Sequence, residues 1–181
     1  MKKSLIAAVV LAGASFGPSA VMAQTVVGNS PHALDWTDLS AYFGDVFAAD
    51  NAGNTFADRF TFTVEGTIGY NLDAIVASIS RSADVGLDVT GLALYGVDDV
   101  LISDGTSVAT GVYDLWTLSS NNLAAGDYYV QVSGDLVSDT AASFGGAIML
   151  APVPEPQTWG MLLGGLGVVG WLARRRQKQQ V

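Results

Sequence analysis

The residues able to do chemistry in this chain are mostly carboxylates. It has 17 aspartates and glutamates, a single histidine, His32, and no cysteine, so no thiol can act as a nucleophile and no disulfide can form. A Ser–His–Asp arrangement would need His32, which stands near the start of the body of the chain, where chains are usually mobile. Residues 24–151 contain no Gly-x-Ser-x-Gly elbow, no His-Glu-x-x-His pair and no Cys/His metal cluster. We therefore expect no enzyme, and a secreted hydrolase using two carboxylates is the least favoured class.

Oxygen ligands for calcium are the stronger chemical alternative, because carboxylates and amides gather in two places. The two groups are Asp45, Asp50, Asn51, Asn54 and Asp58, and Asp98, Asp99 and Asp104. Calcium sites need several such oxygens on a flexible loop, but neither group has the spacing of an EF-hand. Both groups can also be explained as part of an acidic surface in contact with water, and we favour this explanation over a calcium site. The sequence thus predicts no cofactor, with calcium kept as an alternative.

Charge is distributed unevenly along the chain. Of the acidic residues only Glu155 lies outside residues 24–151, and of the eight basic residues only Arg59 and Arg81 lie inside. This leaves the segment with 16 acids, two arginines and a net charge of −14. Such a surface repels nucleic acid and anionic lipid, so neither is an expected partner. A segment of about 130 residues without cysteine is expected to be one domain stabilised by a packed core.

The clearest strand in the sequence runs from Thr55 to Val64. Large apolar side chains and one aspartate, Asp58, occupy one parity, while threonines and Arg59 occupy the other. Alternation of this length predicts a strand with one face in a core. Because Asp58 stands on the apolar parity, we expect it near the strand entrance, hydrogen-bonded or paired with Arg59 or Arg81.

Further strands are expected at short intervals, separated by turns that contain glycine. The expected segments are 72–80, 85–95, 108–118, 127–133 and 144–150, with less regular apolar residues at 34–47 and a loop at 50–54. In 85–95 the alternation predicts one face made by positions 87, 89, 91, 93 and 95. One short helix is expected either at 136–143 or around Asp35. About seven or eight short strands indicate an all-β fold, a single antiparallel β-sandwich or jelly-roll-like domain over residues 24–151.

Residues 152–181 form a segment of a different kind. The motif Val153-Pro154-Glu155-Pro156 precedes an apolar span, 159–173, and a basic end, 174–178, which begins with Arg174, Arg175 and Arg176. The prolines disfavour helix before them, so the motif should be extended and exposed. As a helix the span would be about 22 Å long, against about 30 Å for a bilayer core. We expect a short transmembrane helix that anchors the chain temporarily, with the arginines as a membrane stop on the cytoplasmic side.

This order of motif, apolar span and basic end resembles the PEP-CTERM sorting signal of Gram-negative bacteria. The resemblance implies recognition by an exosortase, a membrane-embedded cysteine transpeptidase, and removal of the tail. It also implies transient anchoring in the inner membrane, followed by delivery to the cell surface or to an extracellular exopolysaccharide matrix such as that of a biofilm.

The start of the chain has the three parts of a secretory signal peptide. Lys2 and Lys3 supply a charged start, residues 5–14 an apolar middle expected to be helical, and Val21-Met22-Ala23 the small residues of an exit. We expect export by the general secretion machinery and cleavage after Ala23 by signal peptidase. Residues 1–23 would then be absent from the exported protein.

The motif Phe56-Ala57-Asp58-Arg59-Phe60 carries a second resemblance. It resembles the opening of a group of surface proteins named for a Phe-x-Asp-x-Phe motif, which carry the same sorting tail. Residues 123–134 resemble a later strand of that group and of secreted sandwich domains found beside bacterial proteases. Through Phe56, Asp58 and Phe60 the resemblance implies a fold and a destination, and no established activity.

Three functional classes are compatible with these features. The leading one is a non-enzymatic exported protein, structural or adhesive in a surface or exopolysaccharide matrix. The second is a polysaccharide- or calcium-binding module, and the third is the secreted hydrolase. Exposed aromatic rings that could stack on sugars are to be sought among Trp36, Tyr42, Tyr70, Tyr95, Trp116, Tyr128 and Tyr129. Tyr128 and Tyr129 are adjacent in an expected strand, so at most one of them can face the core.

Overall fold

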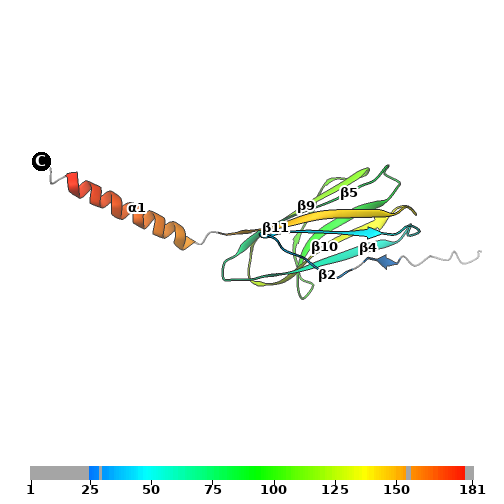
Figure 1. Ribbon diagram of the computed structural model, residues 1–181, viewed down its shortest axis with the longest axis horizontal. Helices are drawn as coiled ribbons and strands as arrows, with labels where there is room; N and C mark the ends of the chain where they lie inside the picture. Colours follow the sequence, from blue (N-terminus) through cyan, green and yellow to red (C-terminus); the bar gives the residue numbers. More distant parts are fainter. Residues whose placement is uncertain (1–24, 29, 154–155, 178–181) are drawn as a thin grey trace, which may run out of the picture.

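The computed structural model describes residues 25–28, 30–153 and 156–177, which form two packed β-sheets and one helix (Figure 1). The expected signal peptide with Ala23 lies outside the described residues, as do Pro154, Glu155 and Lys178. The all-β sandwich expected from the sequence is confirmed.

The six-stranded sheet has the order β1-β4-β10-β6-β7, and β2 also pairs with β4. Its strands are β1 (Val26–Val27), β2 (His32–Ala33), β4 (Thr55–Val64), β6 (Leu87–Gly96), β7 (Leu101–Asp104) and β10 (Gly126–Leu136). The five-stranded sheet has the order β3-β11-β5-β9-β8. Its strands are β3 (Ser40–Phe47), β5 (Tyr70–Ile79), β8 (Thr106–Ala109), β9 (Tyr113–Leu123) and β11 (Ala142–Pro152). The pairings are antiparallel except those of β1 and β2, which run parallel to β4.

The core lies between the two sheets, and β4 supplies its largest aromatic contribution. Phe56, Phe60, Phe62 and Val64 are buried on the inner face, as the alternation predicts. From the other sheet the facing side chains include Leu72, Val76, Phe144 and Ile148. Strand period alone therefore identified this face of the core.

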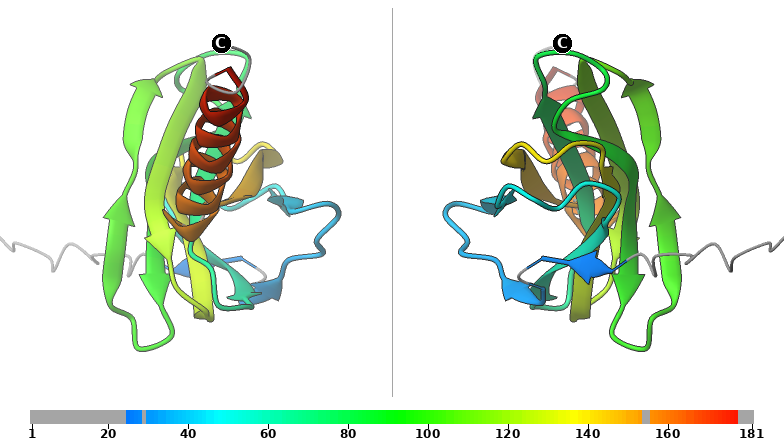
Figure 2. Two further views of the ribbon diagram at one scale, coloured as in Figure 1. Left: turned by 90° about the vertical axis from the view of Figure 1, so that its left-hand side faces the viewer. Right: turned by 90° about the vertical axis from the view of Figure 1, so that its right-hand side faces the viewer.

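One side of the sandwich is closed by a strand that changes sheets. β7 belongs to the six-stranded sheet and β8 to the five-stranded one, and only Gly105 separates them. The N–H of Gly105 donates to the carbonyl of Leu92 (2.7 Å), an approach that leaves no room for a side chain. The N-terminal segment (blue) lies on the opposite side from β7 and β8 (green) in Figure 2. On that opposite side β3 is the edge strand of the five-stranded sheet, and β1 and β2 pair with β4 in the six-stranded sheet.

The alternation expected for residues 85–95 holds only in its first half. The register of β6 against β10 shifts at Thr90, which is the extra residue of a β-bulge. Side chains change faces at such a point, because an inserted residue alters the two-residue period. Leu92 and Leu94 are therefore buried on the same face as Leu87 and Val89, and the prediction that positions 91, 93 and 95 share that face is wrong.

Residues 108–118, expected as one strand, are two. β8 ends at Ala109, β9 begins at Tyr113, and the two pair antiparallel around Gly111. The φ of Gly111 is 116°, a conformation that favours glycine. The apolar Val112 within the turn is half exposed, so apolar content did not reveal the break.

The short helix expected at 136–143 or around Asp35 does not form. Residues 137–141 are a loop after β10. Around Asp35 the backbone extends the pairing of β2, because the N–H of Leu34 donates to the carbonyl of Thr61 (2.9 Å). Asp38 and Leu39 then take φ values of 50° and 63°, outside the right-handed helical region. Residues 38 and 39 therefore form a turn in place of the expected helix.

The helix in the described part of the chain is α1 (Pro156–Gln177), which contains the expected apolar span 159–173. Pro156 is its first residue, a position proline favours because the N–H it lacks would be unsatisfied there. The extended conformation expected for 153–156 therefore does not include Pro156. The helical state of the span is confirmed, but a transmembrane span is not: none of the helices among the described residues is long and apolar enough to cross a membrane.

Candidate functional sites

The sorting segment leaves the sandwich directly from a core strand. β11 lies between β3 and β5, and its last residue, Pro152, pairs with Tyr70. The N–H of Val153 donates to the carbonyl of Gly69 (2.9 Å). Of the predicted motif, Val153 is thus attached to the sandwich and Pro156 begins α1, while residues 154 and 155 lie outside the described residues.

The helix of the sorting segment presents apolar side chains to its surroundings. Figure 1 shows α1 beyond the end of the sandwich, and residues 160–171 are exposed. At about 100° per residue, the exposed side chains cover the whole circumference rather than one stripe. They are Met161, Leu162, Leu163, Leu166, Val168, Val169 and Trp171. A helix that is apolar all round is typical of a segment buried in apolar surroundings.

The basic cluster lies at the far end of the same helix. Arg174 and Arg175 are exposed, and Arg176 follows them within α1. The guanidinium of Arg175 lies 5.4 Å from the ring centroid of Trp171, a cation–π contact. Positive charge in the last turns also complements the negative end of the helix dipole. The order expected from the sequence, apolar span and then basic end, is therefore preserved along one helix.

Asp58 is buried inside the sandwich rather than exposed at a strand entrance. Only 2% of it is exposed, and neither carboxylate oxygen receives a hydrogen bond in the described part of the chain. The expected pairing with Arg59 or Arg81 is wrong, because Arg59 belongs to the opposite face of β4 and Arg81 is exposed in the loop after β5. The guanidinium of Arg59 instead binds Asp99 (3.0 Å).

Asp58 faces a second copy of its own motif. Residues 43–47 of β3 read Phe-Gly-Asp-Val-Phe, and residues 56–60 of β4 read Phe-Ala-Asp-Arg-Phe. The ring centroids of Phe43 and Phe60 are 4.9 Å apart, and those of Phe47 and Phe56 are 4.8 Å apart. The aspartates of the two copies lie between these two ring pairs. Sequence reasoning missed this relationship, although the repeated Phe-x-Asp-x-Phe spacing was the signal that could have found it.

Asp45 and Asp58 line one small pocket. Its volume is about 280 Å³, and its other lining residues are Ser30, His32, Gly44, Arg59 and Phe60. Burial and the neighbouring carboxyl of Asp45 raise the pKa of Asp58 to about 7. His32 is placed in β2 beside this pocket, with its ring edge-on to Phe60, but it donates no hydrogen bond to Asp58. The structure thus gathers a serine, a histidine and two carboxyls without joining them as a triad.

The two acidic groups considered for calcium do not assemble as groups. Asn51 and Asn54 stabilise their own loop, since Asn51 Nδ2 donates to the carbonyl of Ala48 (3.1 Å) and Asn54 Nδ2 to Asn51 Oδ1 (3.2 Å). In the other group Asp99 is paired with Arg59. Among the described residues, no set of three or more His, Asp or Glu side chains could hold a metal ion. Only the pair Asp45 and Asp58 is brought together.

Most of the aromatic candidates for sugar binding serve packing. Tyr128 and Tyr129 face opposite sides of β10 as expected: Tyr128 stacks on Phe62, and Tyr129 stacks on Tyr95 with centroids 5.0 Å apart. The guanidinium of Arg59 covers Tyr129 at 4.7 Å, which buries the ring on the outer face. The remaining candidates Trp36, Tyr70 and Trp116 are half-buried against the core.

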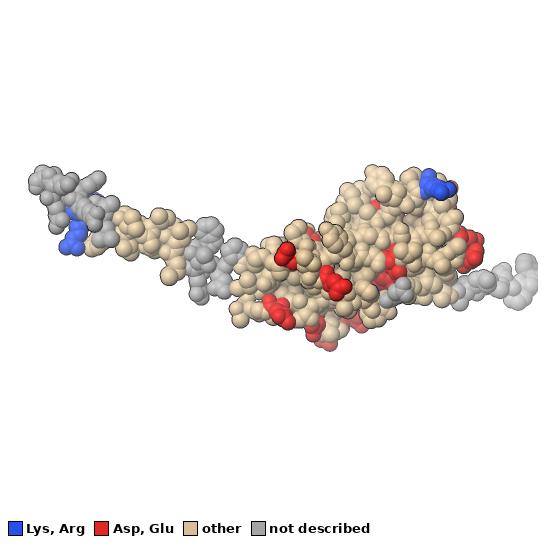
Figure 3. All heavy atoms as spheres, viewed as in Figure 1, with Lys and Arg blue, Asp and Glu red and all other residues tan. Residues whose placement is uncertain are grey.

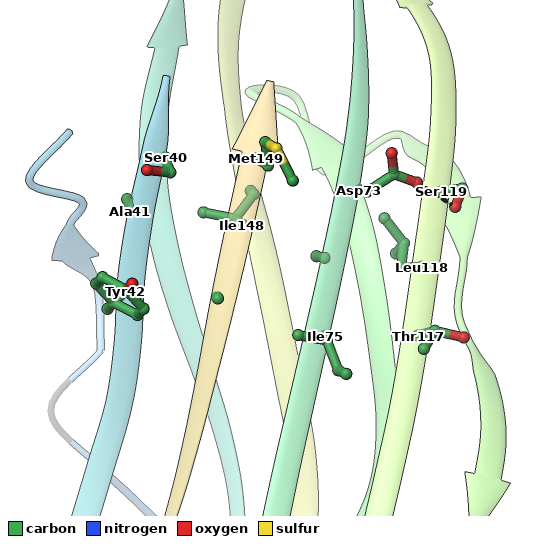
Figure 4. A pocket seen from close by; sticks show the side chains of 12 residues that line it. Ser40, Ala41, Tyr42, Asp73, Ile75, Thr117, Leu118, Ser119, Ile148 and Met149 are labelled. Atoms are coloured by element: carbon green, nitrogen blue, oxygen red, sulfur yellow. Dashed lines mark hydrogen bonds between the residues drawn. The ribbon is translucent and has the colours of Figure 1, made fainter. Parts of the chain in front are cut away.

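Tyr42 is the exception, because it is 85% exposed on the outer face of the five-stranded sheet. Register places Tyr42, Ala147, Ile75 and Thr117 in one row across four strands, and Ser40, Met149, Asp73 and Ser119 in the next. The small Ala147 leaves a shallow hollow of about 440 Å³ between Tyr42 and Ile75 (Figure 4). The hydroxyl of Ser119 donates to Asp73 Oδ1 (2.6 Å) at the polar side of this hollow.

Acidic side chains are scattered over the visible face of the sandwich, whereas basic ones are few and lie at its corner and at the end of α1 (Figure 3). The distribution agrees with the charge of −14 counted for residues 24–151. No broad basic surface faces the viewer. The visible face is unsuited to a polyanion such as nucleic acid.

Comparison with known proteins gives one family match and a distant structural likeness. Residues 152–177 match the family model of the PEP-CTERM protein-sorting motif. One similar solved structure is the pre-peptidase C-terminal domain of collagenase from Bacillus anthracis, with a TM-score of 0.36, 16% identity, and coverage of 67% of this chain and 99% of that one. No protein of curated function matches the sequence. Membership of the Phe-x-Asp-x-Phe group stays a prediction. The C-terminal segment is thus identified as a PEP-CTERM sorting signal, which supports export of the protein and its sorting by an exosortase.

Proposed function

We propose that this protein is a non-enzymatic component of the cell surface or of an exopolysaccharide matrix, where its sandwich is structural or adhesive. The observation that carries the proposal is the connection between β11 and the sorting segment. The last buried residue of β11 is Leu150, and its last paired residue is Pro152. Cleavage beyond Val153 would therefore remove the sorting helix and leave every core strand in place.

The chemistry of the released part fits a soluble extracellular role. Removal of the tail takes away the exposed apolar helix and three arginines, and leaves an acidic sandwich with two arginines. Strong net charge of one sign keeps a protein soluble and discourages self-association. Export by the general secretion machinery, cleavage after Ala23 by signal peptidase, and transient anchoring at the inner membrane belong to the same proposal.

The test is fractionation of the native host with and without its exosortase. We expect the full-length form to accumulate in the inner membrane when the exosortase is deleted, and also when Glu155→Ala is introduced in the normal host. Glu65→Ala is the matched control, because Glu65 is the only glutamate of residues 24–151 and is exposed in the loop after β4. Unchanged release of Glu155→Ala would contradict sorting through this motif.

A second candidate function is polysaccharide binding, favoured by the hollow beside Tyr42. An exposed tyrosine ring, apolar walls from Ile75 and Met149, and the polar pair of Asp73 and Ser119 together suit one face and the edge hydroxyls of a sugar. The feature belongs to the sheet face rather than to a mobile loop. The rest of the sandwich would then serve to hold this face in the matrix.

A further inference from the structure

The carboxyl of Asp58 is buried, and the ionisable group that acts on it is another carboxyl, that of Asp45. Asp58 is 2% exposed, and neither of its oxygens receives a hydrogen bond in the described part of the chain. Burying a carboxylate without hydrogen bonds or counter-charge is strongly destabilising, so native proteins supply a partner, a proton or a metal ion. Asp58 also lines the pocket of about 280 Å³ that Asp45 faces, which has room for a ligand.

Neither described arginine of residues 24–151 directs its charge toward the two aspartates. Arg59 also lines it, but its guanidinium is engaged by Asp99 (3.0 Å) and by the side-chain oxygen of Gln131 (3.2 Å) on the outer face. Arg81, the other arginine of residues 24–151, is exposed in the loop after β5. Two phenylalanine pairs flank the aspartates and keep the local dielectric low, which strengthens the attraction for a cation from outside.

We propose that the pocket between Asp45 and Asp58 binds a divalent cation of the calcium type. Carboxylate oxygens are the ligands such hard cations prefer, and the two aspartates enter from opposite sheets, so one ion would contact both. Two protein carboxylates are few for calcium, and water and the hydroxyl of Ser30 at the pocket wall would complete the coordination. Calcium affinity rises with the number of charged ligands, and this site has only two carboxylates. We therefore expect weak binding, with dissociation constants of about 10⁻⁴–10⁻³ M, as in extracellular calcium modules.

A shared proton is the competing way to neutralise the pair. One proton bridges a single pair of oxygens, so it leaves the other oxygen of Asp58 without a donor, whereas a divalent ion neutralises both carboxylates. The two states respond differently to calcium. Added calcium stabilises a cation site and leaves a proton-bridged pair unchanged at constant pH.

The proposed ion would also connect the N-terminal segment to the sandwich. Between β1 and β2 the chain passes over Asp58 so closely that a Cβ at Gly28 would overlap Asp58 Oδ1. The same segment is attached to β4 by the N–H of Arg59, which donates to Ser30 Oγ (2.7 Å). Ion binding is therefore expected to protect residues 25–33 together with the edge of β4. This inference is independent of the sorting function.

The experiment uses the full chain purified in mild detergent and treated with chelator. Thermal unfolding is followed by tryptophan fluorescence at pH 8, with and without calcium chloride. The calcium concentration is 10 mM, about ten times the higher expected dissociation constant. Binding is measured separately by calorimetry. We expect calcium to raise the Tm of the wild type by about 5 °C. Asp58→Asn should abolish the shift, and it should fold well in chelator because a neutral amide replaces the buried charge.

Asp50→Asn is the matched control. Asp50 is exposed in the neighbouring loop, and asparagine tolerates its φ of 64°. Calcium should raise the Tm of Asp50→Asn by as much as that of the wild type. If this rise in Tm were lost in Asp50→Asn, calcium would bind at the acidic loop and the proposal would be overturned. Absence of both a Tm shift and binding heat in the wild type would overturn it as well. So would a full calcium response in Asp58→Asn.

Discussion

Asp58 on β4 meets Asp45 on β3 across the core, between two pairs of phenylalanine rings in contact. Each aspartate is the centre of a Phe-x-Asp-x-Phe sequence, so the same five-residue pattern stands on both sheets. Burial and the second carboxyl raise the pKa of Asp58 to about 7. When both are ionised, the two carboxylates therefore repel each other, on the side of the sandwich opposite to β7 and β8.

This pKa predicts that the metal-free protein loses stability as the pH rises. In chelator, the folded protein holds a proton on Asp58 up to about pH 7, while the unfolded chain releases it near 3.8. Between these values the folded state binds more protons, so its free energy of unfolding falls with rising pH, in total on the order of 4 kcal/mol. The measurement is the free energy of unfolding in urea from pH 4 to pH 8. The value for Asp58→Asn at each pH is subtracted from that of the wild type, which removes the contribution of the other carboxyls. If the difference in free energy of unfolding between the two proteins did not change over this pH range, the raised pKa of Asp58 would be contradicted.

Gly28→Ala should destabilise the sandwich because two effects act at one residue. The φ of Gly28 is 137°, and the added Cβ would overlap the carboxylate of Asp58. We expect a loss of about 2–3 kcal/mol in the free energy of unfolding. Gly111→Ala is the control, since its φ of 116° is close to that of Gly28 and open space surrounds its Cβ. Equal losses in the two variants would show that contact with Asp58 contributes nothing.

Asp114→Ala should remove a polar connection between the sheets. Asp114 is buried in β9 and accepts hydrogen bonds from the hydroxyl of Ser78 (2.7 Å), the N–H of Val89 (3.0 Å) in the other sheet and the N–H of Gly111 (3.1 Å). Truncation leaves three donors unpaired, two of them buried, and we expect a loss of about 3 kcal/mol in the free energy of unfolding measured with urea. Asp114→Asn keeps one acceptor oxygen and should lose less. A loss below about 1 kcal/mol in Asp114→Ala would show that water replaces the carboxylate.

Tyr42→Ala tests the polysaccharide alternative. The ring is exposed beside the hollow of the five-stranded sheet, so its removal should leave the fold intact and weaken retention on the host's purified exopolysaccharide about tenfold. The measurement is affinity electrophoresis with and without chelator. Tyr113→Ala is the matched control, because Tyr113 is also exposed in the same sheet but does not line the hollow. Equal retention of the two variants would remove sugar stacking at Tyr42 from consideration.

Sequence reasoning succeeded where a feature depends on neighbours along the chain. The inner face of β4 follows from alternation between residues 55 and 64, and the helical state of 159–173 follows from its composition. It failed where pairing with a distant strand intervenes. Thr90 forms a bulge only because β10 lies opposite, and the division of 108–118 depends on β8 and β9 pairing with each other. The expected partner of Asp58 was wrong for the same reason: Arg59 is adjacent in sequence but faces the other side of the strand.

By itself, the sequence determined the class of fold and the presence of a sorting signal. The sorting segment is a linear signal, and strand alternation is a period of two residues, so both can be seen without knowing what lies opposite. Only the tertiary structure decided that Asp45 and Asp58 meet, that Arg59 covers Tyr129, and that Gly105 carries the chain from one sheet to the other. These contacts join residues far apart along the chain, and their register is set by the packing of whole sheets.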